Sequence, residues 1–234
     1  MEIKGFVDIS LVDWDGKVSS VIFLPHCNLR CPYCCNSALV LHPETLSTIP
    51  FEEIESYLQK KHEWIDGVVI TGGEPTIHAD LPHLCSNIKK LGFLVKLDTN
   101  GTNPTVVKGL IDKGLVDYVA MDIKAPLTEE KYSKACGINA KNLLEGIRET
   151  VDLLLGLRVE HEFRTTVVRS LHGKEDVEEI CQKIRGCGKY ALQNFKSEVK
   201  TMNPSYNGIK PFTDEEMKIF LEIARRTVSN TILR

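Results

Sequence analysis

The sequence lacks the features that direct a protein to a membrane or to nucleic acid. No apolar run approaches the roughly 20 residues that a membrane-spanning helix needs. The N-terminal stretch MEIKGFVDIS has neither the basic region nor the apolar core of a signal peptide. The 29 Lys and Arg residues are outnumbered by 32 acidic residues and form no basic stripe. We therefore expect a cytoplasmic protein that binds neither membranes nor nucleic acid.

The chain also lacks repeats, low-complexity tracts and interdomain linkers. With 234 residues, 42% of them hydrophobic, it is long enough to bury one sizeable core. We predict a single domain over 1–234. Within it, residues 1–17 form an N-terminal lead-in and residues 18–195 form the main body. Residues 196–234 form an irregular loop followed by a last helix near 213–229.

Short runs rich in β-branched residues alternate with helical patterns along the main body. The predicted strands are 18–24, 67–71, 93–98, 116–124, 158–168 and 190–195. The predicted helices between them are 50–64, 80–92, 103–114, 139–157 and 173–187, with Gly92 and Gly114 as C-caps. Strands separated by helices of this length form parallel sheets. About six such units are too few for a closed eight-stranded barrel, so we predict an α/β fold with an open, partial (β/α)6 barrel.

Unusual residues follow every predicted strand, at the edge where parallel α/β folds gather their chemistry. The segments concerned are CNLRCPYC (27–34), TGGEP (71–75), DTNG (98–101), MDIK (121–124), Arg164 and LQNF (192–195). We expect them to share one rim of the fold.

The densest feature is a group of four cysteines within nine positions, Cys27, Cys31, Cys34 and Cys35. Disulfides are disfavoured in a reducing compartment. A zinc site would normally take a fourth ligand from a second CxxC pair, which the sequence does not contain. Three thiolates at CxxxCxxC spacing suit a compact metal site, and a cubane held by three cysteines leaves one iron open to a small molecule.

The remaining cysteines do not form a second tight group, so a single cluster is expected. Cys85 and Cys181 lie within helical patterns as core residues, whereas Cys136 and Cys187 lie near loops. Cys35 adjoins Cys34, and because neighbouring side chains point apart both cannot serve one cluster. We expect Cys35 to be a buried packing thiol, with a redox-active neighbour of the cluster as the alternative.

CxxxCxxC with an aromatic residue before its last cysteine, followed by GGEP after the next strand, resembles the radical S-adenosylmethionine (radical SAM) enzymes. The resemblance covers roughly 18–195. It implies that Cys27, Cys31 and Cys34 hold one 4Fe-4S cluster whose open iron binds S-adenosylmethionine, and that Tyr33 covers the cluster near the adenine. It also implies that the turn of Gly72, Gly73, Glu74 and Pro75 contacts the cofactor. One electron then cleaves the cofactor to methionine and a 5′-deoxyadenosyl radical.

Other stretches, among them GFVDISLVDWDG, DTNG and MDIKAP, resemble glycyl radical enzyme activases. The resemblance is nearest to the activating protein of anaerobic ribonucleoside-triphosphate reductase, with pyruvate formate-lyase activase next. It implies abstraction of a glycine α-hydrogen from a partner protein, with a flavodoxin or ferredoxin as electron donor. It further implies that the cofactor is contacted by Lys124, Arg164, Asp98 and Thr99. In addition, Asp98, Thr99 and Asp122 would line a monovalent-cation site.

The chain departs from that family at two points, reading WDG instead of WPG at 14–16 and CCN instead of CHN at 34–36. Two other functions are compatible with the motifs. One is a small-molecule radical enzyme resembling 7-carboxy-7-deazaguanine synthase, and the other is a scaffold whose cluster is only structural.

Overall fold

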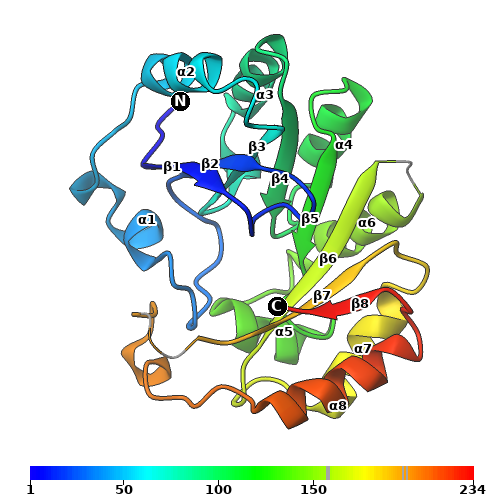
Figure 1. Cartoon of the computed structure of the whole chain (residues 1–234). Coiled ribbons are helices and arrows are strands. Elements are labelled where there is room, and N and C mark those ends of the chain that lie inside the picture. Colours follow the sequence, from blue (N-terminus) through cyan, green and yellow to red (C-terminus); the bar gives the residue numbers. More distant parts are fainter. Residues whose placement is uncertain (157–158, 197, 199) are drawn as a thin grey trace. The chain divides into compact units, whose positions relative to one another are not determined.

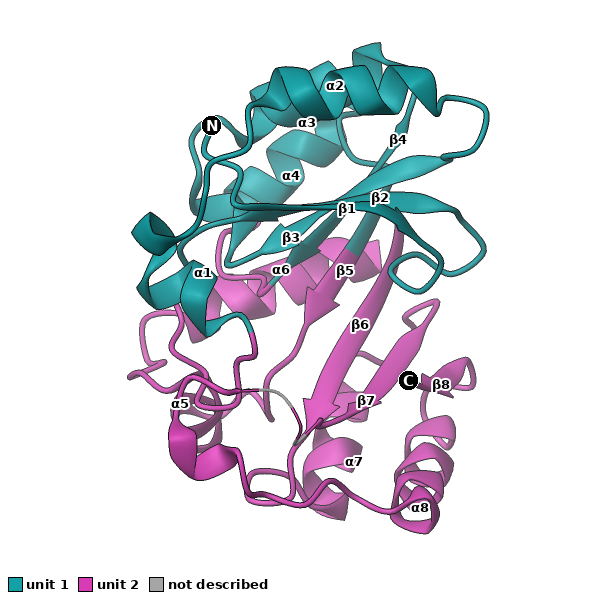
Figure 2. Cartoon of the chain, turned by 60° about the vertical axis from the view of Figure 1, so that its left-hand side comes forward, with its two compact units in different colours: residues 1–28, 36–99, 105–119 teal, residues 29–35, 100–104, 120–234 magenta. Residues whose placement is uncertain are grey.

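The computed structural model describes residues 1–156, 159–196, 198 and 200–234. Residues 157 and 158, where the predicted helix 139–157 meets the predicted strand 158–168, lie outside the described residues. The chain divides into two compact units (Figure 2). Unit 1 comprises Met1–Asn28, Asn36–Thr99 and Thr105–Val119, and unit 2 comprises Leu29–Cys35, Asn100–Pro104 and Ala120–Arg234.

Unit 1 contains a mostly parallel sheet covered by helices. Its strands are β1 (Gly5–Ser10), β2 (Ser19–Leu24), β3 (Gly67–Gly72) and β4 (Leu94–Thr99), and its helices include α1 (Ser37–Leu41), α2 (Phe51–Lys60), α3 (Leu81–Lys90) and most of α4 (Pro104–Asp112). β2, β3 and β4 pair in parallel and in chain order. Most residues of β2 and β3 are buried, as expected for parallel strands covered on both faces.

Local sequence signals explain where these helices begin and end. α2 begins directly after Pro50, carries Glu52 and Glu53 in its first turn and ends with Lys60 in its last turn, which complements the helix dipole. Gly92 and Gly114 have φ angles of +88° and +63°, the left-handed conformation that ends helices. Both predicted C-caps are confirmed.

Unit 2 continues the alternation of strands and helices. β5 (Tyr118–Asp122) runs into it from unit 1, followed by β6 (Glu160–Val167), β7 (Tyr190–Asn194) and β8 (Thr231–Leu233). Its helices are α5 (Glu129–Cys136), α6 (Leu144–Gly156), α7 (Lys174–Lys183) and α8 (Asp214–Arg225). β6, β7 and β8 pair in parallel, and α7 and α8 pack against each other beside them (Figure 1).

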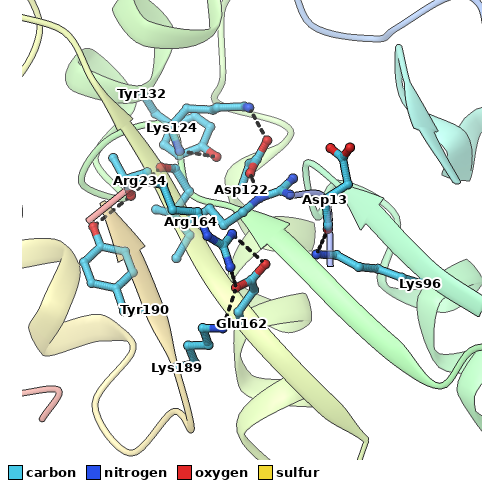
Figure 3. A network of polar contacts seen from close by, with 12 residues as sticks. Asp13, Lys96, Asp122, Lys124, Tyr132, Glu162, Arg164, Lys189, Tyr190 and Arg234 are labelled. Carbon is cyan, nitrogen blue, oxygen red and sulfur yellow. Dashed lines mark hydrogen bonds and ion pairs between the residues drawn. The ribbon is translucent and has the colours of Figure 1, made fainter. Parts of the chain in front are cut away.

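A buried ion pair fixes the last strand. The carboxylate of Glu162, which is fully buried, accepts two hydrogen bonds from Arg234 at 3.0 and 2.7 Å (Figure 3). The carboxylate also lies 3.8 Å from the Lys189 ammonium.

The predicted α/β class is confirmed, since the parallel strands follow chain order in a sheet that does not close. The sequence interpretation did not include two strands. Residues within the predicted lead-in form β1, which pairs antiparallel with β2, and β8 follows the last helix. No helix in the described part of the chain is both long and apolar enough to cross a membrane.

Candidate functional site

The residue just before the first cysteine, between the end of β2 and Cys27, has an unusual backbone conformation. His26 has a φ angle of +59°, a left-handed conformation that residues other than glycine adopt rarely. Its N–H donates to the carbonyl oxygen of Leu39 at 2.9 Å, and its carbonyl oxygen accepts from the Glu74 N–H at 2.8 Å. Half-buried Cys27 therefore follows directly on a residue that is bonded to the GGEP turn.

The two glycines of that turn lie against the backbone that leads to Cys27. Gly72 has a φ angle of +115°, and a Cβ there would lie 2.4 Å from the Leu24 carbonyl oxygen. A Cβ on Gly73 would lie 1.6 Å from the His26 carbonyl oxygen. The Gly73 N–H also donates to the Leu24 carbonyl oxygen at 2.8 Å. Glycine is thus required here by the contact between the two motifs, whatever the turn also binds.

Glu74 is 1% exposed, so its carboxylate must be satisfied inside the unit. Its Oε1 accepts from the Thr76 N–H at 3.1 Å and from the hydroxyls of Thr76 and Thr99 at 2.5 and 2.7 Å. Pro75 begins the short 3-10 turn that follows. These bonds join the end of β3 to the end of β4, where half-buried Asp98 precedes buried Thr99.

The second half of the cysteine loop belongs to unit 2 and is bonded there by its backbone. The Arg30 N–H donates to the Cys136 carbonyl oxygen at 2.8 Å, and the Cys34 N–H donates to the Cys31 carbonyl oxygen at 3.0 Å. Cys31 is 8% exposed, and Cys34 is half-buried.

Tyr33 lies within this loop and is 7% exposed. Its hydroxyl is buried and has no hydrogen-bond partner among the described residues. Burial raises the pKa of this hydroxyl well above its usual value, with the charge of Cys31 adding to the effect. Such a group is a donor that a bound ligand could satisfy.

Three charged side chains, two at the end of β5 and one within β6, form one network (Figure 3). Asp122 accepts from Arg164 Nε at 2.7 Å through Oδ1 and from Lys124 Nζ at 2.8 Å through Oδ2. Burial alone would raise the pKa of Asp122, but the charges of Arg164 and Lys124 outweigh it and lower the pKa well below its usual range. Burial opposes the charged form of Lys124, yet Asp122 raises the Lys124 pKa well above its usual value.

Two buried side chains hold the backbone of Lys124. Its N–H donates to the Tyr132 hydroxyl at 3.3 Å, and its carbonyl oxygen lies 2.8 Å from His172 Nε2. The Val168 N–H donates to His172 Nδ1 at 3.0 Å, which leaves the ring proton on Nε2 to donate to Lys124. Burial lowers the pKa of His172, so the neutral ring is favoured.

The predicted site residues fall into two sets. Unit 1 holds Cys27, Gly72, Gly73, Glu74, Pro75, Asp98 and Thr99, and unit 2 holds Cys31, Tyr33, Cys34, Asp122, Lys124 and Arg164. Among the described residues no group of three or more His, Cys, Asp or Glu side chains is gathered closely enough to hold a metal ion. The predicted cluster ligands and cation ligands therefore remain predictions.

The predicted burial of three other cysteines can be compared with the structure. Cys85 and Cys181 are buried, as predicted, and burial raises the pKa of each thiol to about 12. The expectation for Cys35 was wrong, because it is exposed.

Sequence reasoning overlooked His26, Asn36 and His172 as positioning groups. A left-handed φ at His26 leaves no mark in the sequence. Asn36 stands in the quoted YCCN motif, and its side-chain amide donates to the Gly72 carbonyl oxygen at 2.9 Å.

The residues present fit a cluster with a bound nucleotide in three respects. Three thiols stand at the required spacing. The glycine turn is packed directly against the backbone that leads to the first thiol. A buried tyrosine hydroxyl next to the third thiol has no partner within the described residues.

Comparison with known proteins gives an independent line of evidence. Residues 21–185 match the family model described as the Radical SAM superfamily. A protein of Methanocaldococcus jannaschii, MJ1227, named as a candidate glycyl-radical enzyme activating enzyme, is 34% identical over 233 residues, covering 99% of this chain and 95% of that protein. A second protein with the same description in that organism, MJ1632, is 26% identical over 97% of this chain and 85% of its own length.

An enzyme with a different name matches only part of this chain. The 7-carboxy-7-deazaguanine synthase of Neisseria meningitidis is 32% identical over 124 residues, which are 53% of this chain and 51% of that enzyme.

Solved structures show the same fold at low identity. A radical SAM methyltransferase from Sphaerobacter thermophilus has a TM-score of 0.70 and 15% identity, and this chain covers 67% of it. SuiB of Streptococcus suis bound to S-adenosylmethionine has a TM-score of 0.68 and 16% identity over 92% of this chain. The chain spans about half the length of SuiB.

Proposed function

The chain belongs to the radical SAM superfamily and is a radical SAM enzyme, and from this premise we propose that it activates a glycyl radical enzyme. The observation that carries the proposal is the 34% identity to MJ1227 over almost the whole of both chains. Because that match covers the ends of the chain as well as the motifs, it supports a shared reaction more strongly than the motifs alone.

In this proposal Cys27, Cys31 and Cys34 hold a 4Fe-4S cluster and S-adenosylmethionine binds beside it. The chemistry supplied there would be one-electron cleavage of the sulfonium C–S bond to methionine and a 5′-deoxyadenosyl radical, which would take the α-hydrogen of a glycine in the partner. Tyr33 would donate its unsatisfied hydroxyl to the bound nucleotide or to an ordered water. Its burial would also help to exclude solvent from the radical.

The GGEP turn would bind the methionyl ammonium through the carboxylate of Glu74 or the adjacent carbonyl groups. Glu74 is suited to this role because Thr76 and Thr99 hold its carboxylate in place before any ligand arrives. In the same proposal Lys124 binds the methionyl carboxylate, and Arg164 lies near the ribose or that carboxylate. Both are now bonded to Asp122, so they would have to share that partner with the cofactor.

A monovalent cation at Asp98, Thr99 and Asp122 completes the proposed cofactor set. Hard oxygen donors suit such a cation. Because both oxygens of Asp122 accept from Lys124 and Arg164, the cation would compete with those side chains.

For the partner we propose an anaerobic ribonucleoside-triphosphate reductase, with a flavodoxin or ferredoxin as electron donor. This choice rests on the overall resemblance of the sequence, which is nearest to the activating protein of that reductase, with pyruvate formate-lyase activase next. The cytoplasm is the proposed compartment, because a reduced cluster and eight thiols suit a reducing environment.

The test is anaerobic reconstitution with iron and sulfide, followed by dithionite, S-adenosylmethionine and a candidate reductase from the same cell. We expect a carbon-centred doublet in the EPR spectrum of the reductase and 5′-deoxyadenosine in stoichiometric amount. Cys31→Ala should abolish both, whereas Cys85→Ala, which alters a buried thiol outside the proposed site, should retain them. A Cys31→Ala protein with its cluster and full activity would refute the ligand assignment.

The partial match to 7-carboxy-7-deazaguanine synthase supports a second candidate, a radical reaction on a small heterocyclic substrate. It predicts 5′-deoxyadenosine formation that depends on that synthase's substrate and needs no protein partner. Incubation of the reconstituted enzyme with that substrate alone separates the two candidates.

A further inference from the structure

A short segment of the C-terminal tail is bonded directly to the cysteine loop of unit 2. The Met202 N–H donates to the Cys34 carbonyl oxygen at 3.0 Å, and the Asn203 N–H donates to the Pro32 carbonyl oxygen at 2.9 Å. We call residues 201–207 the strap. Its two bonds fall on both sides of Tyr33, so the strap holds the part of the loop that carries the third proposed cluster ligand.

The strap is closed on itself by one side chain. Asn207 Oδ1 accepts from the Thr201 N–H at 2.8 Å and lies 2.8 Å from the Thr201 hydroxyl. Thr201 is 6% exposed, whereas Asn207 is exposed, so the two bonds are partly buried. The bonds from Thr201 to Asn207 fix the chain immediately before the two N–H groups that reach the cysteine loop.

A second turn keeps the strap compact. Asn203 Oδ1 accepts from the Ser205 N–H at 3.0 Å, and Pro204 begins the 3-10 turn Pro204–Tyr206. Proline fixes its own φ angle, which lowers the entropy that the strap loses on ordering. The strap therefore presents its donors in a largely preformed geometry.

We propose that Asn207 is a positioning residue, which closes the strap so that the strap's backbone holds Pro32–Cys34 in the geometry required for cluster binding. This inference rests on the proposed function, because it assigns Cys34 to the cluster. Metal ligands must be ordered before they can act together, and a loop already held by backbone bonds loses less entropy when the cluster binds.

The chemistry of the closure gives a specific rescue variant. Asn207 acts through an acceptor oxygen toward the Thr201 N–H, so a carboxylate can replace the amide. The single hydrogen of the Thr201 hydroxyl has two acceptors within reach, Asn207 Oδ1 and the Asn203 carbonyl oxygen at 2.7 Å. Asn207→Asp should preserve the strap, whereas Asn207→Ala should open it. Thr201→Ala removes the hydroxyl and keeps the N–H, so it should have an intermediate effect. Asn230→Ala is a matched control, because Asn230 is an exposed amide bonded to Gly188, which is in neither the strap nor the cysteine loop.

The first measurement needs no cluster. Hydrogen exchange of the Met202 and Asn203 amides is followed in the cluster-free protein by NMR. We expect exchange to accelerate by roughly fivefold in Asn207→Ala, the effect of losing one partly buried hydrogen bond whose acceptor side chain is exposed. It should be close to wild type in Asn207→Asp and Asn230→Ala. Equal exchange in Asn207→Ala and wild type would overturn the inference, as would failure of Asn207→Asp to rescue the protection of these amides.

The second measurement follows release of iron from the reconstituted proteins to a chelator under anaerobic conditions. Asn207→Ala should lose iron several times faster than wild type, and the shift of the cluster EPR signal on adding S-adenosylmethionine should weaken. Faster amide exchange without faster iron loss would overturn the positioning role and leave the proposed function intact. Wild-type protein that takes up no cluster would instead overturn the proposed function.

Discussion

The side-chain amide of Asn36 donates a hydrogen bond of 2.9 Å to the carbonyl oxygen of Gly72. At the other end of the cysteine group, the His26 carbonyl oxygen accepts from the Glu74 N–H. The residues just before Cys27 and just after Cys35 are therefore bonded to the same glycine turn. This relationship gives a physical reason why the CxxxCxxC and GGEP motifs occur together in this chain.

Removing the Asn36 amide should loosen the glycine turn. We expect Asn36→Ala to lower the free energy of unfolding by about 1 kcal/mol and to weaken S-adenosylmethionine binding. Asn36→Asp should be at least as harmful, because a carboxylate cannot donate to the Gly72 carbonyl oxygen and would repel it. Chemical denaturation and a binding titration on the reconstituted protein measure the two effects. Unchanged values in both assays would show that the bond does not position the turn.

Gly73 should be the least replaceable glycine of the turn. In Gly73→Ala the new Cβ would lie 1.6 Å from a backbone oxygen, which cannot move aside as a flexible side chain could. We expect a loss of stability of about 1–3 kcal/mol or more. Gly109→Ala is the control, because nothing lies within 4 Å of its Cβ position and alanine favours the helix. Thermal denaturation should show a fall in Tm for the first variant only.

Local patterns were enough to predict much of this fold. The buried strands β2 and β3 consist of short β-branched runs, and Gly92 and Gly114 adopt the left-handed conformation that their positions after helices suggested. The burial of Cys85 and Cys181 followed from their places in amphipathic helices. These features depend on neighbours within a few turns of the chain, so the sequence carries them directly.

Features that depend on distant contacts were not predictable. The exposed residues of β1 do not form the usual strand pattern, and pairing with β2 is what makes it a strand. The ion pair of Asp122 with Arg164 joins residues 42 positions apart. The strap and the φ angle of His26 likewise arise from tertiary hydrogen bonds, because no local rule favours them.

Asp122 should be more important for stability than its position at a strand end suggests. Asp122→Asn leaves the Lys124 and Arg164 charges without their carboxylate at sites where these side chains are 18% and 12% exposed. We expect a loss of about 3 kcal/mol, at the low end for a broken buried pair because some solvent reaches it.

The pH dependence of that loss has a definite sign. Because the pKa of Asp122 is lowered in the folded protein, its stabilisation is present above the unfolded pKa of about 3.9 and disappears as the pH falls through the folded pKa. The difference between wild type and Asp122→Asn should therefore be constant from pH 8 to about pH 5. It should shrink only in stronger acid, as denaturation curves at several pH values would reveal. A difference that shrinks between pH 8 and 6 would contradict this account.

His172 should make the protein sensitive to mild acid. Neutral His172 accepts from the Val168 N–H and donates to the Lys124 carbonyl oxygen, and protonation of Nδ1 would break the first bond. Burial lowers the pKa of His172. The negative charge of Asp176 on α7 acts in the opposite direction, and Asp176 is itself paired with Lys131. The unfolded chain then binds a proton that the folded chain does not. Stability is fully present above the unfolded pKa of about 6.5 and falls as the pH drops toward the folded pKa, by up to about 1.4 kcal/mol per pH unit.

A His172→Gln variant separates this effect from the other six histidines, because glutamine can still donate but does not titrate in this range. At pH 7.5 the variant should be less stable than wild type, since glutamine has no acceptor at the position of Nδ1 and the Val168 N–H loses its partner. Between pH 6.5 and 5.5 the difference in free energy of unfolding between the two proteins should narrow, because only wild type loses the contribution of a neutral ring at position 172. Urea denaturation at pH 7.5, 6.5 and 5.5 gives the three differences. Parallel stability curves for the two proteins would show that His172 titrates alike in the folded and unfolded chains, and the lowered pKa would then be wrong.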